Sequence, residues 1–330
     1  MTPRERFIAA LERRPLPGRV PHFELVFFLT MEAFGRVHPY HRNYEQWWQM
    51  SEAERQLHRQ DMVDLHVATA ERYEHDAIFL HPQPLWNLDE TMRQLDILRD
   101  RVGDRYFVMI HGDATFAIPD GGGLAEFSYR MVDEPQSLRD EAARMVDRKL
   151  AEQQRLADHG GLDGLALCSD YCFNAGPFIS PAAFDEFITP YLKRLIHAQR
   201  QLGFYTIKHT DGNIMPIIDR LVECGPHALH SLDPQGGVDI AEAKRLYGHR
   251  VCLCGNVDCG LMDTGTEAQV LESARYALER GSAAARADSS PGGGYIFCTS
   301  NCIYTGMRLD RYELIWNLWR DYQIPRSTST

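Results

Sequence analysis

The stretch YTIKHTDGN, from Tyr205 to Asn213, passes directly from strand-like residues to a polar cluster. Its first residues, together with residue 204, are mostly apolar or β-branched, which is typical of a buried strand. His209 and Asp211 follow at the point where this strand is predicted to end. Whether the other strands end in the same way decides which fold the sequence encodes.

Eight such runs recur along the chain, at residues 20–27, 76–80, 106–110, 164–168, 204–208, 228–232, 250–254 and 295–299. Their apolar character is continuous rather than alternating, which indicates parallel strands covered on both faces. Helical patterns separate several of them, including 214–225, 239–248 and a longer segment, 181–203, that kinks or restarts at Pro190. The count of eight predicts an α/β fold, a (β/α)8 TIM barrel, with a doubly wound sheet as the alternative.

A helical extension is predicted to precede this barrel, because Thr2 is a suitable N-cap and Pro3 suits the first turn. We expect residues 1–330 to form a single domain, since α/β barrels reach this length as one unit. Residues 280–290 are predicted to be a flexible surface loop, and residues 325–330 a disordered tail.

Polar side chains that can bind ligands follow the predicted strands. They include His81, His111, Asp113, Asp170, Tyr171, His209, Asp211, Asp233, Asn256, Asp258, Asn301 and Cys302. In a barrel the carboxyl ends of all strands meet at the face where the chemistry of barrel enzymes takes place. Asp and Asn at a single strand end are explained by turns alone, but His is not a favoured turn residue. The repeated pattern therefore predicts a functional site.

The composition limits the classes of partner. The chain of 330 residues is 44% hydrophobic and carries a net charge of -11, with a pI of about 5.7. The acidic balance argues against a nucleic-acid partner. No apolar run reaches the roughly 18 residues of a membrane span, and the amphipathic start is not a signal peptide, so we expect a cytoplasmic protein. The eight cysteines are then expected to be free thiols or metal ligands.

Four longer stretches are similar to a known family. Residues 175–195, 208–221, 228–258 and 292–301 resemble the uroporphyrinogen decarboxylase superfamily. The resemblance implies a (β/α)8 barrel and one of two chemistries. One branch decarboxylates the acetate arms of a porphyrinogen without a cofactor. The other uses zinc to move methyl groups between a corrinoid and a thiol or another acceptor.

Two sequence features favour the methyltransferase branch. The decarboxylases carry an arginine-rich stretch after the first strand, which pairs with substrate carboxylates. The equivalent stretch here, residues 24–35, contains no arginine and two glutamates, Glu24 and Glu32. A polyanionic substrate would therefore meet repulsion. The resemblance implies a zinc-dependent methyltransferase whose donor is an ether, an amine or a thiol.

The resemblance also implies metal ligands. The thiol methyltransferases place His-x-Cys after the fifth strand, where this chain has His209 and Asp211, and a further Cys after the eighth. His209 with Cys298 or Cys302 is therefore predicted to bind zinc, which accepts N, O and S ligands. We favour Cys298 by its place at the strand end, and Asp211 or Glu24 would complete the site. The alternative is a hydrogen-bonded His209 beside packed cysteines.

The remaining site residues follow from the same picture. Asp170 and Tyr171 are predicted to act with His209 and Asp211 in catalysis. Substrate contacts are expected from Glu24, His111, Asn213, Asn256 and Asn301. The chain lacks the corrinoid signature Asp-x-His-x-x-Gly, so the corrinoid would come from a partner protein that docks over the open end of the barrel.

Two other functions stay open at this stage. One is a cofactor-free decarboxylase of the uroporphyrinogen type that acts on a less anionic substrate. The other is a barrel that binds a small molecule without catalysis. The sequence leaves both a monomer and a homodimer possible.

Overall fold

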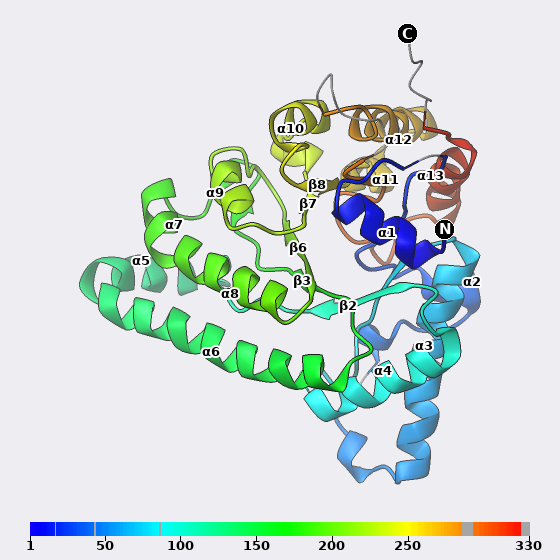
Figure 1. Ribbon diagram of the computed structural model, residues 1–330, viewed down its shortest axis with the longest axis horizontal. Helices are drawn as coiled ribbons and strands as arrows, with labels where there is room; N and C mark the ends of the chain where they lie inside the picture. Colours follow the sequence, from blue (N-terminus) through cyan, green and yellow to red (C-terminus); the bar gives the residue numbers. More distant parts are fainter. Residues whose placement is uncertain (17, 43, 86, 286–292, 325–330) are drawn as a thin grey trace.

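A computed structural model describes residues 1–16, 18–42, 44–85, 87–285 and 293–324. Its main sheet is parallel throughout. The strand order is β1 (Ala77–Phe79), β2 (Phe107–His111), β3 (Gly164–Leu167), β6 (Tyr205–Thr210), β7 (Ala228–Ser231), β8 (Cys252–Cys254) and β9 (Tyr295–Ile296). Helices surround this curled sheet (Figure 1).

The extended segment 21–28 closes the sheet into a ring between its two edge strands, β9 and β1. Just after β9, the backbone N–H of Phe297 donates to the carbonyl of Pro21 at 2.8 Å. On the other side, the N–H of Asp76 donates to the carbonyl of His22 at 2.6 Å. The segment forms isolated parallel bridges rather than a regular strand. The predicted (β/α)8 barrel is confirmed, although its first strand is extended without being regular.

The helices and the smaller elements connect the strands in the expected alternation. The helices are α1 (Pro3–Leu11), α2 (Thr30–Phe34), α3 (Glu52–Arg72), α4 (Leu88–Val102), α5 (Gly123–Asp133), α6 (Pro135–His159), α7 (Pro181–Phe187), α8 (Thr189–Gln201), α9 (Ile218–Glu223), α10 (Ile240–Tyr247), α11 (Cys259–Thr264), α12 (Glu267–Gly281) and α13 (Leu309–Asp321). Short 3-10 turns are η1 (Pro39–His41), η2 (Trp47–Gln49) and η3 (Pro234–Gly236). A hairpin that the sequence did not predict, β4 (Cys172–Phe173) with β5 (Gly176–Pro177), follows β3.

The N-terminal helix α1 covers the end of the barrel at which the strands begin. A capping box formed by Thr2 and Glu5 starts the helix, as its N-cap sequence predicted. Arg4 then pairs at 2.7 Å with Asp163, the residue before β3. On the same helix, Phe7 packs against Phe107 at the start of β2, with ring centroids 4.7 Å apart. The helix α1 therefore covers part of this end of the barrel.

Burial along the strands explains their continuous apolar character. In β2, consecutive side chains that point to opposite faces are all buried, from Phe107 through Met109. The residues of β3 are buried in the same way. One set of side chains fills the barrel interior and the other packs under the outer helices, as expected for a parallel sheet covered on both faces.

The boundaries of some predicted elements differ from those in the structure. The strand β6 extends through Thr210, two residues beyond its predicted end, because it pairs with β7 up to Ser231. The segment 214–225 is helical only in α9, whereas α7 ends at Phe187 and α8 restarts beside Pro190 as predicted. The predicted tail, and most of the second half of the predicted loop 280–290, lie outside the described residues.

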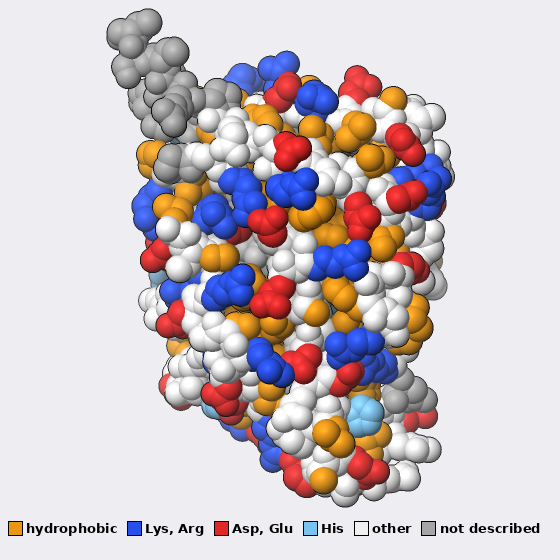
Figure 2. Space-filling view, turned by 90° about the vertical axis from the view of Figure 1, so that its right-hand side faces the viewer, with side chains coloured by type: hydrophobic (Ala, Val, Ile, Leu, Met, Phe, Trp, Pro, Cys, Tyr) orange, Lys and Arg blue, Asp and Glu red, His pale blue; other side chains and the backbone are white. Residues whose placement is uncertain are grey.

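The surface carries charges of both signs. On the face seen in Figure 2, acidic and basic side chains of the described residues are interspersed with apolar ones rather than separated into patches. Within the described residues, no helix combines the length and the apolar character that crossing a bilayer requires.

Candidate active site

Three side chains from two neighbouring strand ends converge at the open end of the barrel. His209, the fifth residue of β6, is buried, and its Nε2 lies 3.6 Å from Asp170 Oδ1 and 3.7 Å from Asp211 Oδ1. One ligand atom from each residue lies within 4.8 Å of the others. One imidazole nitrogen with two carboxylate oxygens is a donor set that zinc accepts. The predicted grouping of these residues is therefore present in the structure.

A second histidine orients His209. The Nδ1 atoms of His209 and His230 are 2.7 Å apart, so one of them donates to the other. Burial lowers the pKa of His230 well below its ordinary value, while the Thr299 carbonyl favours a proton on its ring. Nε2 of His230 has no hydrogen-bond partner among the described residues, and Nδ1 of His230 can accept from Nδ1 of His209. The Nε2 of His209 then presents a lone pair to the two carboxylates.

The carboxylate of Asp211 has unused capacity to bind a ligand. Its Oδ1 is buried without a hydrogen-bond partner, and its Oδ2 accepts from the amide of Asn301. Burial raises the pKa of Asp211 to about 6, and Asp170 adds to that effect while His209 opposes it. An unpaired, buried carboxylate oxygen is costly unless a cation or a proton satisfies it. The Asp211 side chain is thus suited to hold a positively charged group.

A buried ion pair supports the loop that carries Asp170. Lys208 is fully buried and donates to Asp113 Oδ2 at 2.8 Å, and also to the carbonyls of Leu167 and Ser169 at 3.1 and 2.8 Å. Asp113 in turn accepts from the backbone N–H of Ser169 at 3.0 Å. The sequence reasoning noted Asp113 but missed Lys208 and His230. Lys208 lies within an apolar strand run, and this position could have indicated a buried charge that needs a partner.

Tyr171 lies beneath the site rather than in it. Its side chain is fully buried, and its hydroxyl contacts that of Thr115 at 2.5 Å. The ammonium of Lys208 lies over its ring, 4.1 Å from the centroid. The contacts of the hydroxyl place Tyr171 in a supporting position, away from the group formed by Asp170, His209 and Asp211.

The two candidate thiols differ in their surroundings. Cys298 is fully buried, and burial raises its pKa well above the ordinary value, with Glu24 as the largest charged contributor. Cys302 is half-buried, and Asp211 and Asp170 are among the charges that raise its pKa. Neither thiol belongs to a metal-compatible group among the described residues. Cys302, and not the favoured Cys298, shares its surroundings with the two aspartates.

Glu24 is buried in the middle of the extended segment that closes the barrel. Its Oε2 accepts from the backbone N–H and the hydroxyl of Thr299, at 3.1 and 2.6 Å. Its Oε1 has no hydrogen-bond partner. Burial raises the pKa of Glu24 to about 8, although the two hydrogen bonds from Thr299 act to lower it. Glu24 therefore has one free oxygen in a dry environment.

The predicted substrate residues divide into two groups. Burial lowers the pKa of His111 to about 4, and the nearby ring of His209 adds to this effect. Asn301 donates from its side-chain amide to Asp211. By contrast, Asn213 accepts from a backbone N–H two residues on, and Asn256 donates to the carbonyl of Leu232 at 2.9 Å. The structure thus brings His111 and Asn301 to the site, while Asn213 and Asn256 stabilise loops.

A cavity of about 540 Å³ opens beside this group. Asp211, Asp233, Asp263, Asn301 and Tyr304 contribute to its walls, and no Lys or Arg is among its described lining residues. A cavity with three carboxylates repels anions and accepts neutral or cationic molecules. Its size is within the range of small-molecule sites.

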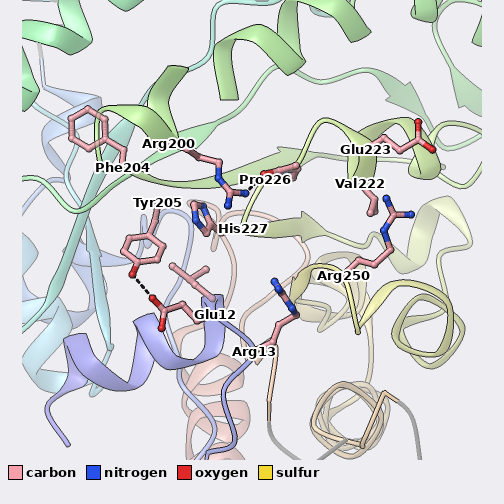
Figure 3. Close-up of a pocket in the computed structure, with 13 residues that line it drawn as sticks. Glu12, Arg13, Arg200, Phe204, Tyr205, Val222, Glu223, Pro226, His227 and Arg250 are labelled. Carbon is pink, nitrogen blue, oxygen red and sulfur yellow. Dashed lines mark hydrogen bonds between the residues drawn. The ribbon is translucent and has the colours of Figure 1, made fainter. Parts of the chain in front are cut away.

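A larger cavity, of about 770 Å³, lies at the opposite end of the barrel. Its walls come from the ends of α1 and α8 and from residues that precede β6, β7 and β8. They carry Arg13, Arg200 and Arg250, and a 2.6 Å hydrogen bond from the Tyr205 hydroxyl to Glu12 (Figure 3). Because catalytic residues of barrel enzymes lie at the carboxyl ends of strands, we do not place the chemistry here.

Gly212 makes the sharp turn after Asp211 possible. Its φ is +75°, and an added Cβ would lie 2.6 Å from the carbonyl oxygens of Cys172 and Phe173. We expect Gly212→Ala to lower the free energy of unfolding by about 2–3 kcal/mol, from backbone strain plus this clash. Gly35→Ala is the matched control, because Gly35 has a φ of +66° with open space around it, and only the strain remains. Equal losses in urea unfolding would contradict the clash.

A family model for uroporphyrinogen decarboxylase (URO-D) matches residues 162–322. These residues include every side chain of the Asp170, His209 and Asp211 group. The match covers slightly less than half of the chain, and within it the segment is similar to the uroporphyrinogen decarboxylase family. No curated protein matches the sequence.

A solved structure shares the barrel fold along nearly the whole chain. A methyltransferase from Methanosarcina mazei superposes with a TM-score of 0.72 and 18% identity, over 97% of this chain and 98% of that one. A GH5_18 protein from Bifidobacterium longum subsp. infantis has a TM-score of 0.49 and 11% identity, over 92% and 80% of the two chains. The first of these likenesses shows the fold.

Proposed function

We propose that the protein is a methyltransferase that moves a methyl group between a small-molecule donor and a corrinoid carried by a partner protein. The observation that carries the proposal is His209 Nε2 lying between the carboxylates of Asp170 and Asp211, beside a cavity with acidic walls. The structural likeness to a methyltransferase supports the same branch of the superfamily.

The residues present fit a zinc ion. Asp211 Oδ1 is a buried oxygen without a partner, and His209 is held by His230 in the orientation that a metal ligand needs. We propose His209, Asp211 and Asp170 as the ligands; neither Cys298 nor Cys302 belongs to this group of the described residues. A zinc ion held there would supply Lewis acidity toward the heteroatom of the methyl donor.

The protein's own residues would bind and orient the donor. The transferred methyl leaves the donor heteroatom without its bonding electron pair and is taken by the electron pair of the reduced corrinoid. The heteroatom keeps the bonding pair, and His111 and Asn301 lie near enough to the site to position it. Asp211 Oδ1 is buried, whereas the side chain as a whole is 27% exposed toward the cavity, from which a bound donor would displace water.

The acidic cavity also bears on the choice of branch and substrate. A porphyrinogen with many carboxylates would face Asp211, Asp233 and Asp263 without a described basic residue in the cavity wall. We therefore favour methyl transfer over decarboxylation of such a polyanion as the function. Among the donor classes, neutral ethers and thioethers and cationic methylated amines fit these walls.

The test uses zinc-loaded protein, chemically reduced free cobalamin and three donors: a methylated amine, a methyl aryl ether and a methyl thioether. We expect at least one donor to convert the cobalamin to its methylated form, seen by its absorption, and chelation of zinc to stop the reaction. Release of CO2 from a carboxylated aromatic, with no methylated cobalamin from any donor, would overturn the proposal.

A further inference from the structure

A second group of metal-compatible side chains lies apart from the active-site group, within the half of the chain that precedes the family match. It consists of His38, the N-cap of η1, His66 in α3 and His81, just after β1. One ring nitrogen from each lies within 4.8 Å of the others. Only His81 was noted in the sequence, as a strand-end residue. We call this group the three-histidine cluster.

Three ring nitrogens of the cluster are buried without a hydrogen-bond partner. Nε2 of His66 and both ring nitrogens of His81 are buried and make no hydrogen bond, although the Phe79 carbonyl weakly favours a proton on His81. Nδ1 of His38 accepts one long bond, 3.2 Å, from the backbone N–H of Tyr40. Buried polar groups in native proteins are normally paired, and each unpaired one costs about 1–3 kcal/mol. Three unpaired ring nitrogens on two neighbouring histidines, with His38 beside them, indicate a common partner.

The chemistry of the cluster favours a cation as that partner. Burial lowers the pKa of His38 to about 2 and that of His66 to about 4, so both rings are neutral near pH 7. Neutral imidazole is the form that binds metals. A small cavity of about 30 Å³, enough for one water molecule or an ion, is lined by the three histidines together with Glu24, His75 and apolar side chains. Glu24, the one carboxylate among its described lining residues, has its Oε1 unpaired.

We propose that the three-histidine cluster binds a divalent transition-metal ion of the zinc class, at a site separate from the His209 group. Three imidazole donors select zinc, cobalt, nickel or copper over magnesium and calcium. A water molecule or Glu24 Oε1 would fill the fourth position. The ion would fasten η1 and α3 to the end of β1, at the rim of the open barrel end.

Neighbouring rings connect this site with the active-site face. The rings of His81 and His111 have centroids 5.2 Å apart, and His209 contributes to the low pKa of His111. The three-histidine cluster therefore borders the proposed substrate region. A metal ion there would hold one wall of the active site in place without contacting the group formed by Asp170, His209 and Asp211.

The experiment measures bound metal in full-length protein that has been stripped with chelator and titrated with Zn²⁺, and separately with Co²⁺ for its absorption spectrum. We expect two equivalents of Zn²⁺ in the wild type and one in His209→Ala. His66→Ala should also retain one, and the double variant none. His197→Ala, which removes an exposed histidine of α8, is the control and should leave both sites intact.

The design separates this proposal from the proposed function. If His209→Ala keeps the wild-type stoichiometry but His66→Ala loses one equivalent, the three-histidine cluster stands and the active-site metal fails. His66→Gln, which preserves much of the side-chain volume, guards against misfolding and should lose the same equivalent with an unchanged circular dichroism spectrum. Unchanged stoichiometry and unchanged Co²⁺ absorption in both His66 variants would overturn the proposal.

Discussion

His209→Ala is expected to remove the metal ion from the active site and to reduce methyl transfer by more than about 100-fold. Loss of an outer partner of a metal ligand alone costs 10–100-fold, and His209 is the one proposed ligand nitrogen between the two carboxylates. Without it, Asp170 and Asp211 would face each other with no imidazole between them. The measurements are the rate of cobalamin methylation and the zinc content of the purified variant.

One control variant and one milder variant accompany this experiment. His197→Ala removes an exposed histidine far along α8 and should keep full activity. Asp211→Asn keeps the shape of the side chain but removes a charged oxygen, so it should weaken zinc binding less than His209→Ala. Wild-type rates in His209→Ala would show that the chemistry takes place elsewhere on the molecule.

Asp113→Ala is expected to lower the free energy of unfolding by about 3–5 kcal/mol, because it leaves the buried ammonium of Lys208 without its carboxylate. The carbonyls of Leu167 and Ser169 would remain as acceptors, but neither carries a full charge. The loop that carries Asp170 would also lose the hydrogen bond from Ser169 N–H to Asp113. Guanidinium unfolding followed by fluorescence measures the loss.

A surface pair supplies the comparison. Glu186 pairs with Arg139, and both side chains are largely exposed, so Glu186→Ala should cost less than about 1 kcal/mol. Asp113→Asn, which keeps an acceptor oxygen, should fall between the two variants. A cost for Asp113→Ala as small as that for Glu186→Ala would mean that Lys208 does not depend on its buried partner.

Local patterns were sufficient to predict the barrel and part of the site. A strand that is covered by helices on both faces appears in the sequence as a continuous apolar run. The strands could therefore be counted from the residues alone. His209 and Asp211 could be grouped because they follow one strand, and Asp170 because the neighbouring strand ends at the same rim. The exception was the first strand, whose regularity depends on pairing with residues about 275 positions away.

Contacts between distant segments could not be predicted in this way. Lys208 looks like an ordinary strand residue until Asp113, on another strand, is placed beside it. The three-histidine cluster combines a loop, a helix and a strand end, and none of them carries a pattern that marks its histidine. The choice between Cys298 and Cys302 depended on which face of the strand each cysteine occupies. The strand β9 ends at Ile296, before either cysteine, so its register does not decide the choice.

The closure of the ring by residues 21–28 bears on how the chain folds during its synthesis. These residues leave the ribosome well before their backbone partners after β9, which lie about 275 positions further along the chain. Until then both β1 and β9 are open sheet edges, which can pair with other chains. The barrel therefore closes only once the residues after β9 are available, and the high sequence separation of this contact slows the closure.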